Sequence, residues 1–167
     1  MNNTPHTKRI LFVCSGNACR SQMAEGWARK LSGGKVEAYS AGVEAHGVDP
    51  SAIAVMAEAG VDISNQRSKS VHVLPEITFD CVVTLSERAA TLFRSHPVQV
   101  PVVEVSCESP VRRASRKAPA LTHYRHVRDD IRDEVRTVLN RILPKITKTN
   151  QRPSMVLSEA QFFAFPT

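Results

Sequence analysis

Short apolar runs alternate with amphipathic segments along most of this chain, and this alternation restricts the fold more than any other feature. The apolar runs are rich in β-branched residues and have the length of buried strands. They lie at Arg9–Val13, Val36–Ala41, Phe79–Leu85 and Val98–Val105. Segments with helical spacing lie at Ser21–Leu31, Pro50–Gly60, Ser86–Phe93 and Thr122–Leu143. This order predicts an α/β fold, in which helices cover both faces of a parallel sheet.

Cap and breaker residues refine these boundaries. Ser21 and Asp49 are suited to cap the helices that they precede or begin, and Gly60 ends the second helix. Pro97 and Pro101 limit the last strand, because proline cannot donate to a ladder of hydrogen bonds.

Length and composition indicate one ordinary globular domain of 167 residues, 42% hydrophobic and 23% charged. We expect this domain over residues 1–147 and a flexible C-terminal tail over residues 148–167, since no hydrophobic period continues past Pro144. No apolar run approaches the ~18 residues of a membrane span. The N-terminus has no apolar stretch of a secretory signal, so we expect a cytoplasmic protein. Four cysteines do not make a disulfide framework, and the thiols are therefore candidates for chemistry or core packing.

The net charge of +6 raises nucleic acid as a possible partner. Most of the late basic residues, however, alternate with acidic ones, as Arg128 and Arg132 do with Asp129 and Asp133. This pattern is typical of a solvated helix face. Since no aromatic platform or zinc-finger spacing accompanies it, we expect no binding to nucleic acid. We also expect a monomer that does not bind a membrane.

The strongest local signal is the segment Cys14–Ser21, which reads Cys-Ser-Gly-Asn-Ala-Cys-Arg-Ser directly between the first strand and the first helix. Ligands of parallel α/β proteins bind at the carboxyl ends of strands, where this segment lies. Gly16 and Asn17 tolerate positive φ, so the loop can curl and turn its N–H groups inward beside the positive end of the helix dipole. The expected oxyanion-binding residues are Ser15, Gly16, Asn17, Ala18, Cys19 and Arg20.

The same segment contains the elements of nucleophilic catalysis. The Arg20 guanidinium can fork onto two oxygens of a tetrahedral anion. Cys14 lies at the base of an electropositive cup, where the thiolate is favoured and faces the central atom for in-line attack. The Ser21 hydroxyl can hydrogen-bond the sulfur and stabilise it as a leaving group. A buried cysteine followed by a chance arginine is the alternative, and the strand, the Gly-Asn pair and the helix around the segment argue against it.

These residues resemble the low-molecular-weight protein tyrosine phosphatase superfamily, and more narrowly the thioredoxin-coupled arsenate reductases that share its fold. The resemblance covers Val13–Gly26, Ser40–Pro50, Gly60–Asn65, Val82–Leu85 and Val127–Ile131. It implies a four-stranded parallel sheet, Cys14 as nucleophile, Arg20 as oxyanion clamp, and Asn17 with Ser40 as supports of the loop. It also implies arsenate, phosphate or a phosphoester as substrate, and no bound cofactor. The reductant would be an external thiol, either thioredoxin, glutaredoxin or a small thiol.

The chain departs from this family in its thiols. Ser86 stands where the reductases carry a second redox cysteine, and Glu87–Phe93 contains no thiol. Cys81 lies within a predicted strand, where core packing is expected. Cys19 and Cys107 remain as candidate resolving thiols, beside a thiol supplied from outside.

A second departure concerns the general acid that the family places after the fourth strand, and the residues at the rim of the site. Ser109 takes the place of the Asp in the family's Asp-Pro loop, and Glu108 can replace that acid only if the loop shifts. The tyrosine expected after Asp-Pro is missing, which argues against a dedicated phosphotyrosine pocket. Glu25 matches a carboxylate near which some reductases hold a monovalent cation. Lys69 stands where a further Asp is expected and can replace that cation, so no metal is expected.

Three functions follow from these observations. We favour an arsenate-reductase-like enzyme that attacks a tetrahedral oxyanion with the Cys14 thiolate. A phosphatase that works through a phosphocysteine is the second interpretation. The third is a non-catalytic module that binds oxyanions and regulates a partner.

Overall fold

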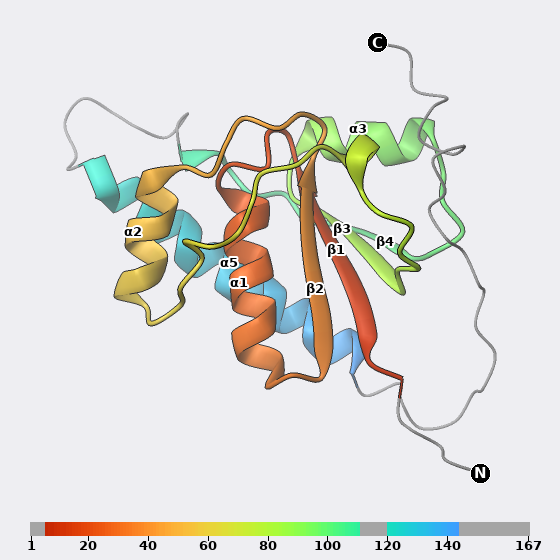
Figure 1. The fold of residues 1–167 in the computed structure, drawn as a ribbon, viewed down its shortest axis with the longest axis horizontal. Helices are drawn as coiled ribbons and strands as arrows, with labels where there is room; N and C mark the ends of the chain where they lie inside the picture. Colours follow the sequence, from red (N-terminus) through yellow and green to blue (C-terminus); the bar gives the residue numbers. More distant parts are fainter. Residues whose placement is uncertain (1–5, 111–119, 144–167) are drawn as a thin grey trace.

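The computed structural model describes residues 6–110 and 120–143, and strands and helices alternate along them as predicted (Figure 1). The strands are β1 (Lys8–Cys14), β2 (Val36–Gly42), β3 (Cys81–Thr84) and β4 (Val102–Glu104). The helices are α1 (Arg20–Ser32), α2 (Pro50–Glu58), α3 (Glu87–Ser95) and α5 (Ala120–Ile142), with a 3-10 turn η1 at Val71–Val73. The expected tail over residues 148–167 lies outside the described residues. None of the helices within the described ranges is both long enough and apolar enough to cross a membrane.

The four strands form one all-parallel sheet in the order β2-β1-β3-β4, which confirms the predicted fold class. Cys14, the last residue of β1, pairs with Gly42 at the end of β2. One residue earlier, Val13 pairs with Thr84 at the end of β3. The register therefore brings the loops after three strands together at the carboxyl edge, around the Cys14–Ser21 segment.

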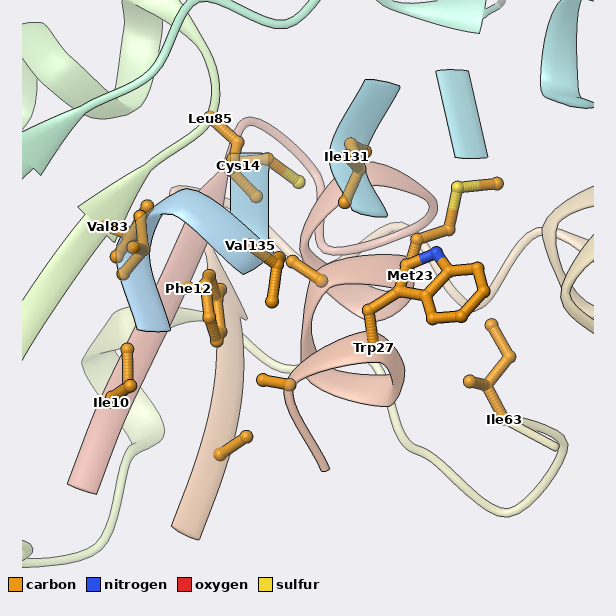
Figure 2. Packing of buried hydrophobic residues seen from close by; sticks show 14 of the residues in the cluster. Ile10, Phe12, Cys14, Met23, Trp27, Ile63, Val83, Leu85, Ile131 and Val135 are labelled. Atoms are coloured by element: carbon orange, nitrogen blue, oxygen red, sulfur yellow. The ribbon is translucent and has the colours of Figure 1, made fainter. Parts of the chain in front are cut away.

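Each face of the sheet packs against its own hydrophobic cluster, because successive strand residues point to opposite faces. On one face, Ile10 and Phe12 of β1 pack with buried residues of α1, α2 and α5 (Figure 2). On the other face, Leu11 and Val13 pack with residues of α3 and η1. Helices thus cover both faces, as predicted, and β1 is buried between them.

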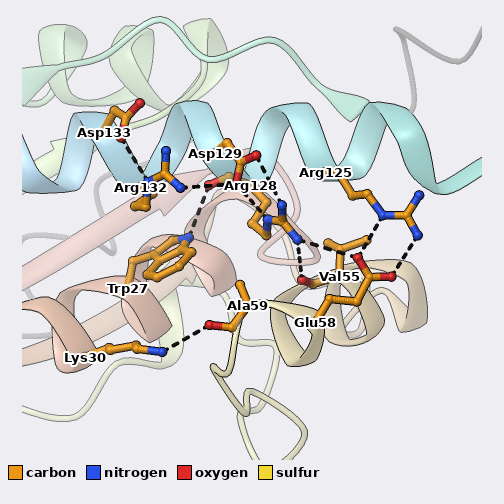
Figure 3. Close-up of polar contacts among 10 residues, drawn as sticks. All are labelled: Trp27, Lys30, Val55, Glu58, Ala59, Arg125, Arg128, Asp129, Arg132 and Asp133. Atoms are coloured by element: carbon orange, nitrogen blue, oxygen red, sulfur yellow. Dashed lines mark hydrogen bonds and ion pairs between the residues drawn. The ribbon is translucent and has the colours of Figure 1, made fainter.

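Helix α5 is fixed to its neighbours by polar contacts as well as by its apolar stripe (Figure 3). The Trp27 indole N–H of α1 donates to the Arg128 carbonyl at 3.1 Å, and Arg128 Nη1 donates to the Val55 carbonyl of α2 at 3.0 Å. Arg125 pairs with both carboxylate oxygens of Glu58 at 2.8 Å. Part of the charged face that the sequence assigns to solvent therefore joins α5 to α2.

Three predicted boundaries were wrong, each for a local reason. Strand β4 is shorter than Val98–Val105, because Pro101 accepts a bond from Val82 N but has no N–H to continue the ladder. Strand β3 likewise begins only at Cys81, because the N–H of Asp80 before it bonds the Arg9 carbonyl outside the regular pairing. Helix α1 begins at Arg20 without a side-chain cap, because the Ser21 hydroxyl turns to Cys14 instead.

Candidate active site

Four carbonyl groups of the Cys14–Ser21 loop turn toward the segment that follows β2. Val43 N, Glu44 N, His46 N and Asp49 N donate to the carbonyls of Cys14, Ser15, Gly16 and Ala18 at 2.9–3.0 Å. In a trans peptide the N–H points away from the carbonyl, so the N–H groups of the following residues face the opposite side of the loop. The loop thereby presents a row of backbone donors toward one concave site, as an anion-binding nest requires.

Two glycines allow this close contact between the loop and the segment after β2. A Cβ on Gly42 would lie 2.1 Å from the Glu44 carbonyl oxygen and 2.6 Å from Asn17 N, both backbone atoms. A Cβ on Gly16 would lie 2.5 Å from His46 Nδ1. A side chain at Gly16 would therefore require the exposed His46 ring to move, and positive φ occurs at the neighbouring Asn17, with φ of 46°. Asn17 is one of the two residues that the sequence analysis expected to let the loop curl, and this expectation is confirmed.

Asn17 supports the loop from behind and is completely buried. Its Nδ2 donates to Ser21 Oγ at 2.9 Å and to Ser40 Oγ at 3.0 Å. Its Oδ1 accepts from Lys69 N at 2.8 Å and from Gln22 Nε2 at 3.0 Å. Because every polar atom of the amide has partners, its orientation is fixed, and the loop is tied to β2 through Ser40.

The Ser21 hydroxyl lies against the nucleophile, with Ser21 Oγ 3.0 Å from Cys14 Sγ. Asn17 donates to Ser21 Oγ, which leaves the Ser21 proton available to the sulfur when Cys14 is a thiolate. A hydrogen bond to the sulfur stabilises the thiolate form. The role expected for Ser21 is therefore geometrically possible, and Asn17 orients it.

The buried carboxylate of Glu25 ends this chain of hydrogen bonds. Ser40 Oγ donates to Glu25 Oε2, and Arg29 Nη2 forms an ion pair with Glu25 Oε1. Because an unpaired buried charge is costly, Arg29 supplies the compensation that the carboxylate needs. Lys69 Nζ hydrogen-bonds the Arg67 carbonyl at 3.3 Å, and its charge also interacts with Glu25. Its role as a substitute for a cation stays a prediction, while the direct ion pair is made by Arg29.

Arg20 begins α1 and spans the site. Its Nη1 donates to the Leu85 carbonyl at 3.1 Å and to the Cys107 carbonyl at 3.0 Å. These bonds hold the guanidinium between the end of β3 and the loop after β4. Because both use Nη1, the nitrogens Nε and Nη2 remain for an oxyanion, as the expected clamp requires.

A cavity of about 180 Å³ opens over the loop. It is lined by Cys14, Ser15, Gly16, Ala18, Cys19, Arg20, His46, Asp49 and Ser109. Most of the predicted oxyanion-binding residues therefore share one site, with Asn17, Ser21 and Ser40 buried behind it. Among the described residues, the lining contains no Phe, Tyr or Trp.

Two further predicted site residues belong neither to the lining of this cavity nor to the buried group behind it. Glu108 is exposed, and its neighbour Ser109 faces the site instead. Cys107 is half-buried against the main core and contributes its backbone carbonyl to Arg20. The structure adds His46 and Asp49, to which the sequence analysis gave no site role. Their position in the sequence could have identified them, since they follow the second parallel strand and therefore reach the same edge of the sheet as Cys14.

The remaining thiols are poorly placed for a relay. Burial raises the pKa of the Cys19 thiol far above its ordinary value, and its Sγ lies 3.9 Å from Met23 Sδ in the core. Burial also raises the pKa of Cys81 to about 11 and that of Cys107 to about 11. Cys81 is 3% exposed, which confirms its expected place in the core. At neutral pH these thiols therefore remain protonated, whereas an attacking thiol must be a thiolate.

The fold and this site define a cysteine-dependent enzyme class. The family of low molecular weight phosphotyrosine protein phosphatases matches residues 9–150, and the chain belongs to this family. Among solved structures, the chain is similar to a low molecular weight protein tyrosine phosphatase from T. tengcongensis. That likeness has a TM-score of 0.65 and 29% identity, and covers 81% of this chain and 99% of the other.

Within the family, the chain is similar to proteins named arsenate reductase. The protein from Halalkalibacterium halodurans is 40% identical over 130 residues, which are 78% of this chain and 94% of the relative. The Bacillus subtilis protein is 41% identical over 124 residues, 74% of this chain and 89% of the relative. A solved arsenate reductase in a phosphate-binding state has a TM-score of 0.65 and 32% identity, covering 81% of this chain and 98% of the other. These likenesses confirm the family resemblance drawn from the sequence.

Proposed function

We propose that this chain reduces arsenate, with Cys14 as the nucleophile and a thiol from another molecule as the reductant. The observation that carries the proposal is a cavity of about 180 Å³ that is lined by both Cys14 and Arg20. Sites for drug-sized ligands occupy about 300–1,000 Å³, so this cavity suits a small tetrahedral oxyanion. The lack of an aromatic wall among the described residues favours an inorganic anion over an aryl ester. The arsenate reductases at 40% identity support the same conclusion.

In the first step the Cys14 thiolate attacks arsenic in line. The S–As bond forms, an As–O bond breaks, and the leaving oxygen takes a proton and departs as water. Arg20 and the loop N–H groups stabilise the charge on the remaining oxygens. Ser21 holds Cys14 Sγ in place at 3.0 Å. The product of this step is an arsenate group bound covalently to Cys14.

In the second step a thiol attacks Cys14 Sγ. The S–As bond breaks and its electron pair remains on arsenic, which leaves as arsenite. Arsenic is thereby reduced from the +5 to the +3 state, while the two sulfurs are oxidised to a disulfide and the thiol proton passes to arsenite. A second external thiol then exchanges with this disulfide and regenerates Cys14.

An external thiol is preferred because the chain has no suitable internal one. Ser86 accepts a hydrogen bond from the Ser15 hydroxyl at 3.1 Å and caps α3 through Ala89 N, which are structural contacts. Cys19 and Cys107 are held as neutral thiols by burial. A small thiol, glutaredoxin or thioredoxin can supply the thiolate instead. The reducing cytoplasm, where such thiols are abundant, is the compartment that suits this chemistry.

Phosphatase activity is the second candidate, and the match to the phosphatase family over residues 9–150 favours it. The same cavity, nucleophile and arginine would form a phosphocysteine that water hydrolyses. This reaction needs no reductant, and it depends strongly on a proton donor for the leaving group.

One pair of assays tests the proposal. Arsenite formation is measured with a small thiol, with glutaredoxin plus that thiol, and with thioredoxin, beside hydrolysis of p-nitrophenyl phosphate. We expect arsenite with at least one donor, and a mixed disulfide at Cys14 when turnover is stopped by alkylation. Hydrolysis without arsenite formation would replace the proposal by the phosphatase. Oxyanion binding without either reaction would favour the non-catalytic module.

A further inference from the structure

The reaction requires a proton donor, and the positions indicated by the sequence do not supply one. The oxygen that leaves arsenic or phosphorus departs far more easily as water or an alcohol than as an anion. Ser109 lines the cavity, but a hydroxyl does not release its proton at neutral pH. Glu108 is exposed and does not line the cavity.

Among the described residues, five side chains that line the cavity can ionise. They are Cys14, Cys19, Arg20, His46 and Asp49. Cys14 is the nucleophile, Cys19 holds its proton tightly because burial raises its pKa, and an arginine does not release its proton. Two side chains remain to be compared.

Asp49 is held as an acceptor on both oxygens. Its Oδ1 accepts from Ser51 N at 2.8 Å, and its Oδ2 accepts from the Tyr124 hydroxyl at 2.7 Å. Both oxygens of Asp49 are occupied by these donors, so neither is free to present a proton to the cavity. Asp49 acts as the cap of α2.

His46 has the arrangement of a proton donor. Its backbone N–H bonds the Gly16 carbonyl at 3.0 Å, which fixes the residue to the rim of the loop. Its Nε2 lies 2.9 Å from Glu44 Oε2, and Arg88 Nη2 holds the other Glu44 oxygen at 2.6 Å. Hydrogen bonds from Arg88 and His46 lower the pKa of Glu44 to about 2, so Glu44 is an anion at neutral pH. Nε2 thus faces this carboxylate, and the other ring nitrogen, Nδ1, lies beside Gly16 of the loop.

We propose that His46, paired with Glu44, is the proton donor that protonates the leaving oxygen during attack by Cys14. The proposal rests on the proposed function and extends it to phosphate esters processed in the same cavity. In the arsenate reaction, thiolate, dihydrogen arsenate and imidazolium give the Cys14 adduct, one water and neutral imidazole. The charge is −1 on both sides. The imidazole side chain, 57% exposed, then regains its proton from solvent.

The test compares leaving groups in His46→Gln and in the unchanged protein. Glutamine keeps a polar side chain near Glu44 but transfers no proton. We expect hydrolysis of phenyl phosphate, whose leaving group is poor, to fall about 10²-fold. Hydrolysis of p-nitrophenyl phosphate should fall less than tenfold, and arsenate reduction should fall with phenyl phosphate. Imidazole added to His46→Ala should restore part of the activity.

Two matched variants complete the experiment. His72→Gln, at an exposed histidine outside the cavity, should leave both rates unchanged. Glu44→Gln removes the carboxylate that holds His46 Nε2, and it should lower phenyl phosphate hydrolysis more than p-nitrophenyl phosphate hydrolysis. Equal losses for both esters in His46→Gln, or no loss, would overturn the role of His46 even if arsenate is reduced. A leaving-group-dependent loss in a protein that reduces no arsenate would instead support His46 and overturn only the proposed reductase function.

Discussion

The buried support of the Cys14 loop and the exposed rim of the cavity are built in different ways. Behind the loop, Asn17, Ser21 and Ser40 are completely buried and bonded to one another. At the rim, Glu44 pairs with His46 and Arg88, and all three side chains are about half exposed. The interior therefore fixes the nucleophile and the oxyanion site, while the rim determines protonation and access. Substitutions at the rim change the reaction at little cost to the fold.

The largest effect is expected from removing the nucleophile. Cys14→Ser should lower arsenate reduction and ester hydrolysis by roughly 10⁴-fold or more, because a hydroxyl is hardly ionised at neutral pH. Phosphate binding, measured by calorimetry, should change by less than about tenfold, since Arg20 and the loop N–H groups remain. Appreciable turnover in this variant would refute attack by Cys14.

The next effect concerns the close contact behind the loop. Gly42→Ala should lower the free energy of unfolding by roughly 2–4 kcal/mol, because its Cβ meets backbone atoms that cannot move aside. Gly47→Ala is the matched control, since its Cβ meets nothing within 4 Å and only its φ of 82° is unfavourable. That control should cost roughly 1 kcal/mol. Urea denaturation measures the free energy of unfolding of both variants. Similar losses of stability in the two would show that the close contact at Gly42 does not exclude a side chain.

A smaller effect is expected on the loop after β4. Ser109→Asp places a carboxyl group on the lining of the cavity and should raise phenyl phosphate hydrolysis roughly tenfold. Glu108→Gln should change it less than twofold, because Glu108 lies outside that lining. A large loss in Glu108→Gln would restore Glu108 as the acid and show that this loop moves during the reaction.

The smallest effect is expected from the other thiols. In a variant with serine at positions 19, 81 and 107, arsenate reduction with an external thiol should stay within about threefold of the starting rate. Burial keeps these thiols neutral, so none is a ready nucleophile. Loss of multiple turnover, together with a Cys14–Cys19 or Cys14–Cys107 disulfide in the unchanged protein, would show an internal relay. Thermal unfolding of the variant serves as the control for its stability.

The sequence could predict what depends on local pattern. The strand and helix order, the two-sided cover of the sheet and the place of Cys14 follow from periodicity and from the rule for parallel sheets. The partners of single side chains could not be predicted, because they come from distant segments. The Cys107 carbonyl of the loop after β4, for example, accepts from Arg20 of α1. His46 escaped notice because its role depends on Glu44, Arg88 and the loop meeting in three dimensions.

The four bonds of the Asn17 amide have a consequence for motion. They tie together the loop, α1, β2 and the segment at Lys69, so the loop cannot open alone without breaking contacts in all of them. Local opening should therefore require a free energy close to that of global unfolding. The amides of Val43, Glu44 and His46, which donate to loop carbonyls, should then be among the slowest to exchange with deuterium. An arriving oxyanion would meet donors already in position, and its binding would involve no step of loop closure.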